Sequence, residues 1–241
     1  MMKLVLDFGN TLQKAAIFDG DEMVFLQEYK LLTLIELKAL INKYTIDKAI
    51  LSSVINHNID IVSYLISSFP FVELDKNTKV PLIIKYDTVN TLGKDRLAAI
   101  VAAQSIYPDQ NILVINAGTC ITYDFINDKK EYLGGAISPG VQMKFKALNN
   151  FTDKLPFVKG RKDVKLIGKT TEESILSGVI NGTYFEMTAM IEEYKAEYKD
   201  LKIIISGGDR IYFDKRFNNT IFAISNIVLI GLNLILDFNA K

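Results

Sequence analysis

The sequence has few of the residues that build disulfide frameworks and transition-metal sites. Its 241 residues include one cysteine, one histidine (His57) and no tryptophan. A single cysteine cannot form an internal disulfide and is typical of a reducing compartment. A lone histidine is more often a surface or core residue than a ligand, and one Cys and one His are too few for a zinc site. We therefore expect a cytoplasmic protein without a Cys/His metal centre.

The sequence also lacks an excess of charge and a long hydrophobic run. Lys and Arg total 28, as do Asp and Glu, so the formal net charge is zero. A protein that coats nucleic acid normally carries a basic excess, so we expect no nucleic-acid partner. The longest apolar tract, residues 222–236, is shorter than a membrane span and contains Asn226 and Asn233. It predicts a buried helix. The first apolar run ends at Asp7, too early for a signal peptide, and no membrane partner is expected.

What the sequence does contain is one pattern that occurs twice. An apolar strand at residues 4–6 runs into Asp7-Phe8-Gly9-Asn10-Thr11, and two more strands follow. A strand at residues 111–115 runs into Asn116-Ala117-Gly118-Thr119, again with two strands after it. Asp7 and Asn116 hold the same place in the two copies. A duplicated domain is the simplest explanation, and we place the domains at 1–109 and 110–241.

Apolar periodicity and turn residues predict the other elements. Helices are expected at residues 31–44, 58–69, 94–106, 171–198 and 225–238. Strands are expected at residues 48–54, 71–72, 82–84 and 202–205.

The turn after the first strand is a candidate phosphate site. Gly9 permits a tight turn with exposed N–H groups, which make an anion-binding concavity together with a Thr hydroxyl. Asp7 at the strand end can hold Mg²⁺, directly or through water. Lys14 can reach a phosphate from the next strand. An ordinary hairpin uses the same residue types, and the second copy of the motif favours the functional interpretation.

The start of the helix at residues 94–106 is a second candidate. An Asp in a first turn complements the helix dipole and needs no function. The functional interpretation makes Asp95 a general base and Arg96 a clamp for a carboxylate or phosphate. Glycines at 134–140 and at 207–208 let a ligand approach the backbone, although ordinary turns use them too.

Taken in order, these motifs resemble those of type III pantothenate kinases over nearly the whole chain. The motifs are Asp-x-Gly-Asn-Thr from residue 7, Gly-x-Asp-Arg from 93, Ala-Gly-Thr from 117, Gly-Gly-x-Ile-x-Pro-Gly from 134 and Gly-Gly at 207. The resemblance implies an α/β homodimer of chains with two duplicated RNase-H-like (actin-like ATPase) domains, mixed sheets and a central cleft. It implies transfer of the ATP γ-phosphoryl group to the 4′-hydroxyl of pantothenate, the first step of coenzyme A biosynthesis.

The resemblance also assigns site residues. The implied ATP-binding residues are Asp7, Phe8, Gly9, Asn10, Thr11, Leu12, Gln13, Lys14 and Thr119, with Asp7 holding the Mg²⁺. The implied substrate-binding residues are Tyr86, Gly93, Lys94, Asp95, Arg96 and Thr171. Asp95 would accept the proton of the hydroxyl, and Thr171 would act from the other subunit.

One position departs from the family pattern. The second loop usually begins with an Asp that coordinates a monovalent cation, K⁺ or NH₄⁺, where this chain has Asn116. An amide oxygen can ligate a cation but brings no charge. Two alternatives stay open: a family member that has lost activity and acts as an accessory regulatory protein, and a kinase for another small hydroxy acid. Retention of Asp7, Asp95, Arg96 and Thr119 favours the enzyme.

Overall fold

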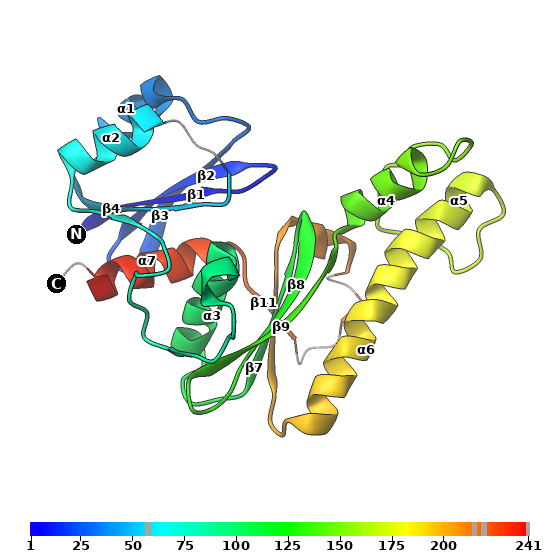
Figure 1. Cartoon of the computed structure of the whole chain (residues 1–241). Coiled ribbons are helices and arrows are strands. Elements are labelled where there is room, and N and C mark those ends of the chain that lie inside the picture. The colour runs from blue at the N-terminus through cyan, green and yellow to red at the C-terminus, as the bar shows by residue number, and fades with distance from the viewer. Residues whose placement is uncertain (56–58, 214–215, 218–220, 240–241) are drawn as a thin grey trace. The chain divides into compact units, whose positions relative to one another are not determined.

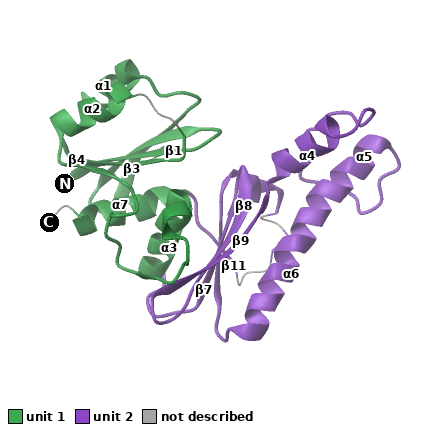
Figure 2. Ribbon diagram, in the orientation of Figure 1, with its two compact units in different colours: residues 1–106, 226–241 green, residues 107–225 purple. Residues whose placement is uncertain are grey.

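The structure is a computed structural model that describes residues 1–55, 59–213, 216–217 and 221–239 (Figure 1). His57 lies outside the described residues. The chain divides into two compact units (Figure 2): unit 1 comprises residues 1–106 and 226–241, and unit 2 comprises residues 107–225. No helix in the described part of the chain is both long enough and apolar enough to span a bilayer.

Unit 1 is built on a five-stranded mixed sheet with the order β3-β2-β1-β4-β5. An antiparallel meander is followed by two strands that add in parallel beside β1. The strands are β1 (Met2–Phe8), β2 (Gln13–Asp19), β3 (Glu22–Tyr29), β4 (Ile46–Ser53) and β5 (Phe71–Glu73).

Helices cover both faces of this sheet. Successive side chains of β1 point to opposite faces, and those of Leu4, Val5 and Leu6 are all apolar and buried. Leu4 and Leu6 pack with α1 (Leu34–Ile41) and α2 (Ile59–Ser68) in one core. Val5 packs in another with α3 (Lys94–Ile106) and α7 (Ile227–Asn239) (Figure 1). A short strand, β6 (Ile83–Ile84), and a 3₁₀ turn (Val89–Thr91) lie between β5 and α3.

The predicted division at residue 109 places the last helix, α7, in the second domain, whereas the structure places it in unit 1. α7 belongs to unit 1, where Gly231 lies so close to α3 that a Cβ there would come within 1.8 Å of the Ala98 carbonyl oxygen. Asp237 near the end of α7 bridges Lys3 and Lys48 of the sheet at 2.6 and 2.9 Å. These contacts join segments between 133 and 234 residues apart, which local sequence patterns do not report.

Unit 2 repeats the architecture of unit 1, which supports the predicted duplication. Its strands run β11-β10-β7-β8-β9, with an antiparallel β7-β8-β9 meander and two strands in parallel beside β7. The strands are β7 (Ile112–Ala117), β8 (Cys120–Ile126), β9 (Glu131–Pro139), β10 (Lys202–Ser206) and β11 (Ile221–Ala223). Strand order and direction therefore match unit 1 strand for strand.

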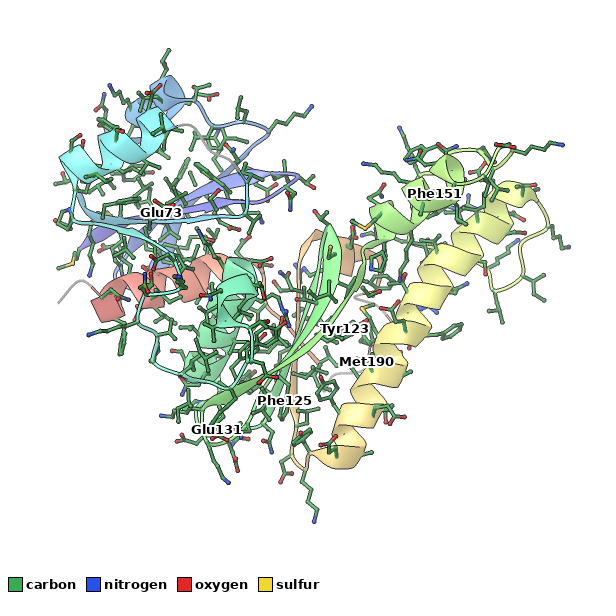
Figure 3. The ribbon with its side chains drawn as sticks, viewed as in Figure 1. Glu73, Tyr123, Phe125, Glu131, Phe151 and Met190 are labelled. Atoms are coloured by element: carbon green, nitrogen blue, oxygen red, sulfur yellow. The ribbon has the colours of Figure 1, made fainter. Side chains whose placement is uncertain are left out.

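The helices of unit 2 pack on one face of this sheet. They are α4 (Val141–Asn150), α5 (Thr171–Leu176) and α6 (Gly182–Glu197), with a π-helical turn (Ser177–Asn181) joining the last two and a 3₁₀ turn (Gly208–Tyr212) after β10. Buried Tyr123 of β8 and partly buried Met190 of α6 share one core (Figure 3). The helix predicted at 171–198 is thus confirmed, with a local change of winding.

The helix predicted across residues 222–236 is wrong at its start. Phe222 and Ala223 belong to β11, which pairs with β10, and α7 begins at Ile227. Asn226 separates strand from helix with φ of +58°. Apolar content alone does not distinguish a short buried strand from a buried helix.

Candidate active site

The end of β1 gathers three polar side chains in unit 1. Asp7 is paired in register with Lys14 of β2 and with Ser52 of β4. Paired residues on neighbouring strands point to the same face, so the carboxylate lies between an ammonium and a hydroxyl. This is the face on which α3 and α7 pack.

The first turn of α3 adds a second carboxylate, Asp95. Burial, as the larger cause, and the negative charge of Asp95 together raise the pKa of Asp7 from 3.8 to about 7, although Lys14 and the Ser52 hydroxyl act in the opposite direction. Two carboxylates close enough to disturb one another are a common feature of sites that bind a metal or move a proton.

The loop after β1 is a tight, accessible turn. The Gly9 amide donates to the Leu12 carbonyl at 3.1 Å, and Asn10 and Thr11 are exposed. Two neighbours predicted to bind ATP have their side chains inside the fold. Phe8 belongs to the core with α1 and α2, and the buried Gln13 side chain accepts from the Leu32 amide at 2.6 Å.

The predicted substrate-binding residues Asp95, Arg96 and Tyr86 lie close together at the start of α3. The Asp95 carboxylate accepts from the Arg96 amide at 2.9 Å. Arg96 is buried, and its guanidinium lies 5.6 Å from the ring centre of Tyr86. A cation near an aromatic ring is attracted to it, so these two side chains fix each other. Lys94 instead lines a cavity of about 80 Å³ with Leu97 and the loop before α3.

Unit 2 carries the matching positions without their charges. Asn116 of β7 is paired in register with Thr122 of β8 and with Ser206 of β10. The buried Thr122 hydroxyl has no hydrogen-bond partner in the part of the chain that the structure describes. Asp124, one step further along the same face, is fully buried and accepts from the Tyr132 hydroxyl at 2.7 Å.

The remaining predicted residues lie on the surface of unit 2. Thr119 is exposed in the turn between β7 and β8, and Thr171 is exposed at the first position of α5. Among the described residues, no group of three or more His, Cys, Asp and Glu side chains forms a metal cluster.

Sequence reasoning missed three polar residues of unit 1 that contact the site. Ser52 ends a predicted strand, but only the register with β1 places it beside Asp7. Glu28 and Asn226 both contact the Lys14 ammonium. Asn226 is distant in sequence, so no local pattern could have found it.

Substitution Asp7→Asn is expected to stabilise the ligand-free protein at pH 8 by a few degrees in Tm. Because the folded-state pKa of Asp7 lies above its ordinary value, the stability of the chain falls as pH rises from about 4 to about 7. The amide avoids that loss, and at pH 4.5 the two proteins should differ little. Thermal unfolding at both pH values measures this. Equal gains at the two pH values would contradict a charge effect.

Comparison with known proteins identifies a family and a fold. The family model of type III pantothenate kinases matches residues 3–193. The type III pantothenate kinase of Christiangramia forsetii is 45% identical over 240 residues, which cover 99% of each chain.

Solved structures give the same fold at low identity. A protein described as a conserved putative Baf family transcriptional activator, from Campylobacter jejuni, has a TM-score of 0.59 at 22% identity, with 98% of both chains covered. The activator of 2-hydroxyisocaproyl-CoA dehydratase from Clostridium difficile has a TM-score of 0.52 at 12% identity, covering 100% of this chain and 96% of that one. The predicted fold class, two duplicated RNase-H-like units of the actin-like ATPase type with mixed sheets, is confirmed.

Proposed function

This chain belongs to the type III pantothenate kinase family, and we propose that it transfers the γ-phosphoryl group of ATP to the 4′-hydroxyl of pantothenate, the first step of coenzyme A biosynthesis. The structural observation that best supports this chemistry is the Asp7–Asp95 pair at the end of β1, with Lys14 beside it. Phosphoryl transfer needs positioning and charge neutralisation more than covalent help.

The nucleotide half of the site belongs to the loop after β1. This exposed turn contributes backbone N–H groups and the Thr11 hydroxyl, and Lys14 follows on β2. Asp7 fits a Mg²⁺ ion, because a cation would stabilise the ionised carboxylate, which burial and, to a smaller extent, the charge of Asp95 disfavour. When bound with ATP, the ion would neutralise charge on the phosphates. In unit 2, Thr119 is the residue that the family resemblance assigns to ATP binding.

The acceptor half belongs to the first turn of α3. Asp95 takes the proton of the attacking hydroxyl, and Arg96, held by Tyr86, pairs with the carboxylate of pantothenate. Gly93 leaves the Asp95 carboxylate accessible to the substrate, because a Cβ at residue 93 would lie only 2.7 Å from that carboxylate. The accessory-protein alternative has no matching feature, since both carboxylates and Lys14 are in place.

Replacement of the proposed base should remove turnover and spare folding. Asp95→Asn is expected to lower kcat by about 10²–10⁴-fold, the usual contribution of a positioned base, with little change in binding of either substrate. Asp60→Asn, which removes a first-turn carboxylate from α2, is the matched control for helix-dipole effects. Steady-state kinetics with binding by calorimetry measures both. Near-normal turnover of Asp95→Asn would remove Asp95 from the mechanism.

The monovalent-cation position is proposed to be weak. Asn116 and the Thr122 hydroxyl, which has no hydrogen-bond partner among the described residues, offer oxygen ligands but no charge. Charge contributes most where the effective dielectric is low. We expect turnover to depend little on K⁺ or NH₄⁺ relative to a bulky organic cation at equal ionic strength. The Asn116→Asp variant should become strongly K⁺-dependent. Strong dependence in the wild type would show that neutral oxygens suffice.

We further propose a cytoplasmic homodimer in which Thr171 completes the partner's substrate site. Supporting this, Thr171 of α5, Gly178 of the π-helical turn, and Gly182 and Phe185 of α6 are exposed, and a Cβ at either glycine would meet nothing within 4 Å. Phe185→Glu should give a folded monomer with little activity, measured by light scattering and turnover. Ile35→Glu on exposed α1 is the control. A fully active monomer would exclude the shared site.

A further inference from the structure

The ammonium of Lys14 is held by two oxygens from different elements of unit 1. Glu28 of β3 provides a carboxylate oxygen at 3.1 Å, and Asn226, immediately before α7, accepts a hydrogen bond at 3.3 Å. Glu28 is half exposed, whereas Lys14 is about a quarter exposed. The two partners differ in charge, so they act differently on the ammonium: Glu28 neutralises it, and the amide of Asn226 orients it without neutralising it.

Asn226 has a backbone and side-chain arrangement that is unusual for its place. Its carbonyl accepts the Ile230 amide, so it stands at the cap position of α7. An Asn at that position commonly uses its side-chain oxygen to accept an N–H of its own helix. Here the side-chain oxygen accepts from Lys14 instead. Its φ of +58° lies in the left-handed region, which Asn tolerates better than most residues do.

The packing of α7 fixes the place of Asn226. At the far end of the helix, Asp237 is bridged to two largely buried lysines, Lys3 and Lys48. In the middle, Gly231 lies against the backbone of Ala98 in α3, the helix whose first turn carries Asp95. The amide of Asn226 is therefore carried by a helix anchored to both the sheet and α3.

We propose that Asn226 is a positioning residue that aims the Lys14 ammonium at the phosphate loop and counters the attraction of Glu28. The proposal rests on the proposed function, because it assumes that Lys14 contacts a phosphate of ATP. Asn226 does not touch the reacting atoms and acts through Lys14. Without it, Glu28 becomes the main partner of Lys14, and the positive charge is drawn towards β3 and offset there.

Asn226→Gly tests this, because glycine keeps the left-handed backbone and removes only the amide. We expect the KM for MgATP to rise about three- to tenfold, the range for loss of one hydrogen bond, with the KM for pantothenate unchanged. Asn226→Asp keeps the acceptor and adds a charge, so it should retain kcat but also raise the KM for MgATP. Asp200→Gly is the control for the backbone effect, since Asp200 is exposed with φ of +56°.

A double-mutant cycle with Lys14→Met separates this proposal from the proposed function. If Lys14 has no phosphate role, Lys14→Met alone leaves the KM for MgATP unchanged, which overturns that role and this proposal with it. If Lys14→Met raises the KM and Asn226→Gly adds nothing further in that background, Asn226 acts through Lys14. Equal effects of Asn226→Gly in both backgrounds, or no effect in the wild type, would overturn the positioning role alone.

Discussion

Two carboxylates held near one another at the end of β1 are the constraint on which unit 1 depends. Burial and the charge of Asp95 both disfavour the ionised form of Asp7, so the position of the two carboxylates is electrostatically unfavourable. The packing of α3 on the sheet holds them there. Val5 and Ile50 of the sheet, with Ala98 and Val101 of α3, form part of the core that fixes the distance. Hydrophobic burial thus maintains an electrostatic strain that a cation or a transferable proton can relieve.

That core is completed by a segment from the opposite end of the chain. Leu229, Leu232 and Leu236 of α7 enter it beside the side chains of β1 and α3. The fully buried ammonium of Lys3 would be strongly unfavourable alone, and Asp237 of α7 provides its counter-charge at 2.6 Å. α7 is therefore held by specific contacts as well as by apolar packing. An ion pair fixes one end of the helix, and the Gly231–Ala98 contact fixes its middle. The position of Asn226 beside Lys14 follows from this docking.

The sequence predicted what depends on local pattern and missed what depends on long-range contact. The strands of both meanders, most of the helices and the duplication follow from periodicity and turn residues, whereas α4 is not among the predicted helix ranges. The family resemblance assigned ATP binding to Phe8 and Gln13 along with Asp7. Strand alternation already indicates that the side chains of Asp7 and Phe8 lie on opposite faces of the sheet. The membership of α7 in unit 1 and the role of Asn226 had no such local signal.

The duplication shows how one framework carries two electrostatic environments. Asp7, Lys14 and Ser52 occupy the same three strand positions in unit 1 that Asn116, Thr122 and Ser206 occupy in unit 2. The serine is common to both, and the charged pair of unit 1 is replaced in unit 2 by an amide and a hydroxyl.

A carboxylate attracts a divalent cation far more strongly than neutral oxygens do, so only the unit 1 position suits Mg²⁺. The neutral position in unit 2 adds no negative charge to repel a polyphosphate. The buried carboxylate of Asp124, one step further along the same face, accepts from the Tyr132 hydroxyl through one of its oxygens. The asymmetry between the two copies therefore supports the proposal that metal binding and charge neutralisation belong to unit 1, while unit 2 makes the contacts that neutral groups can make.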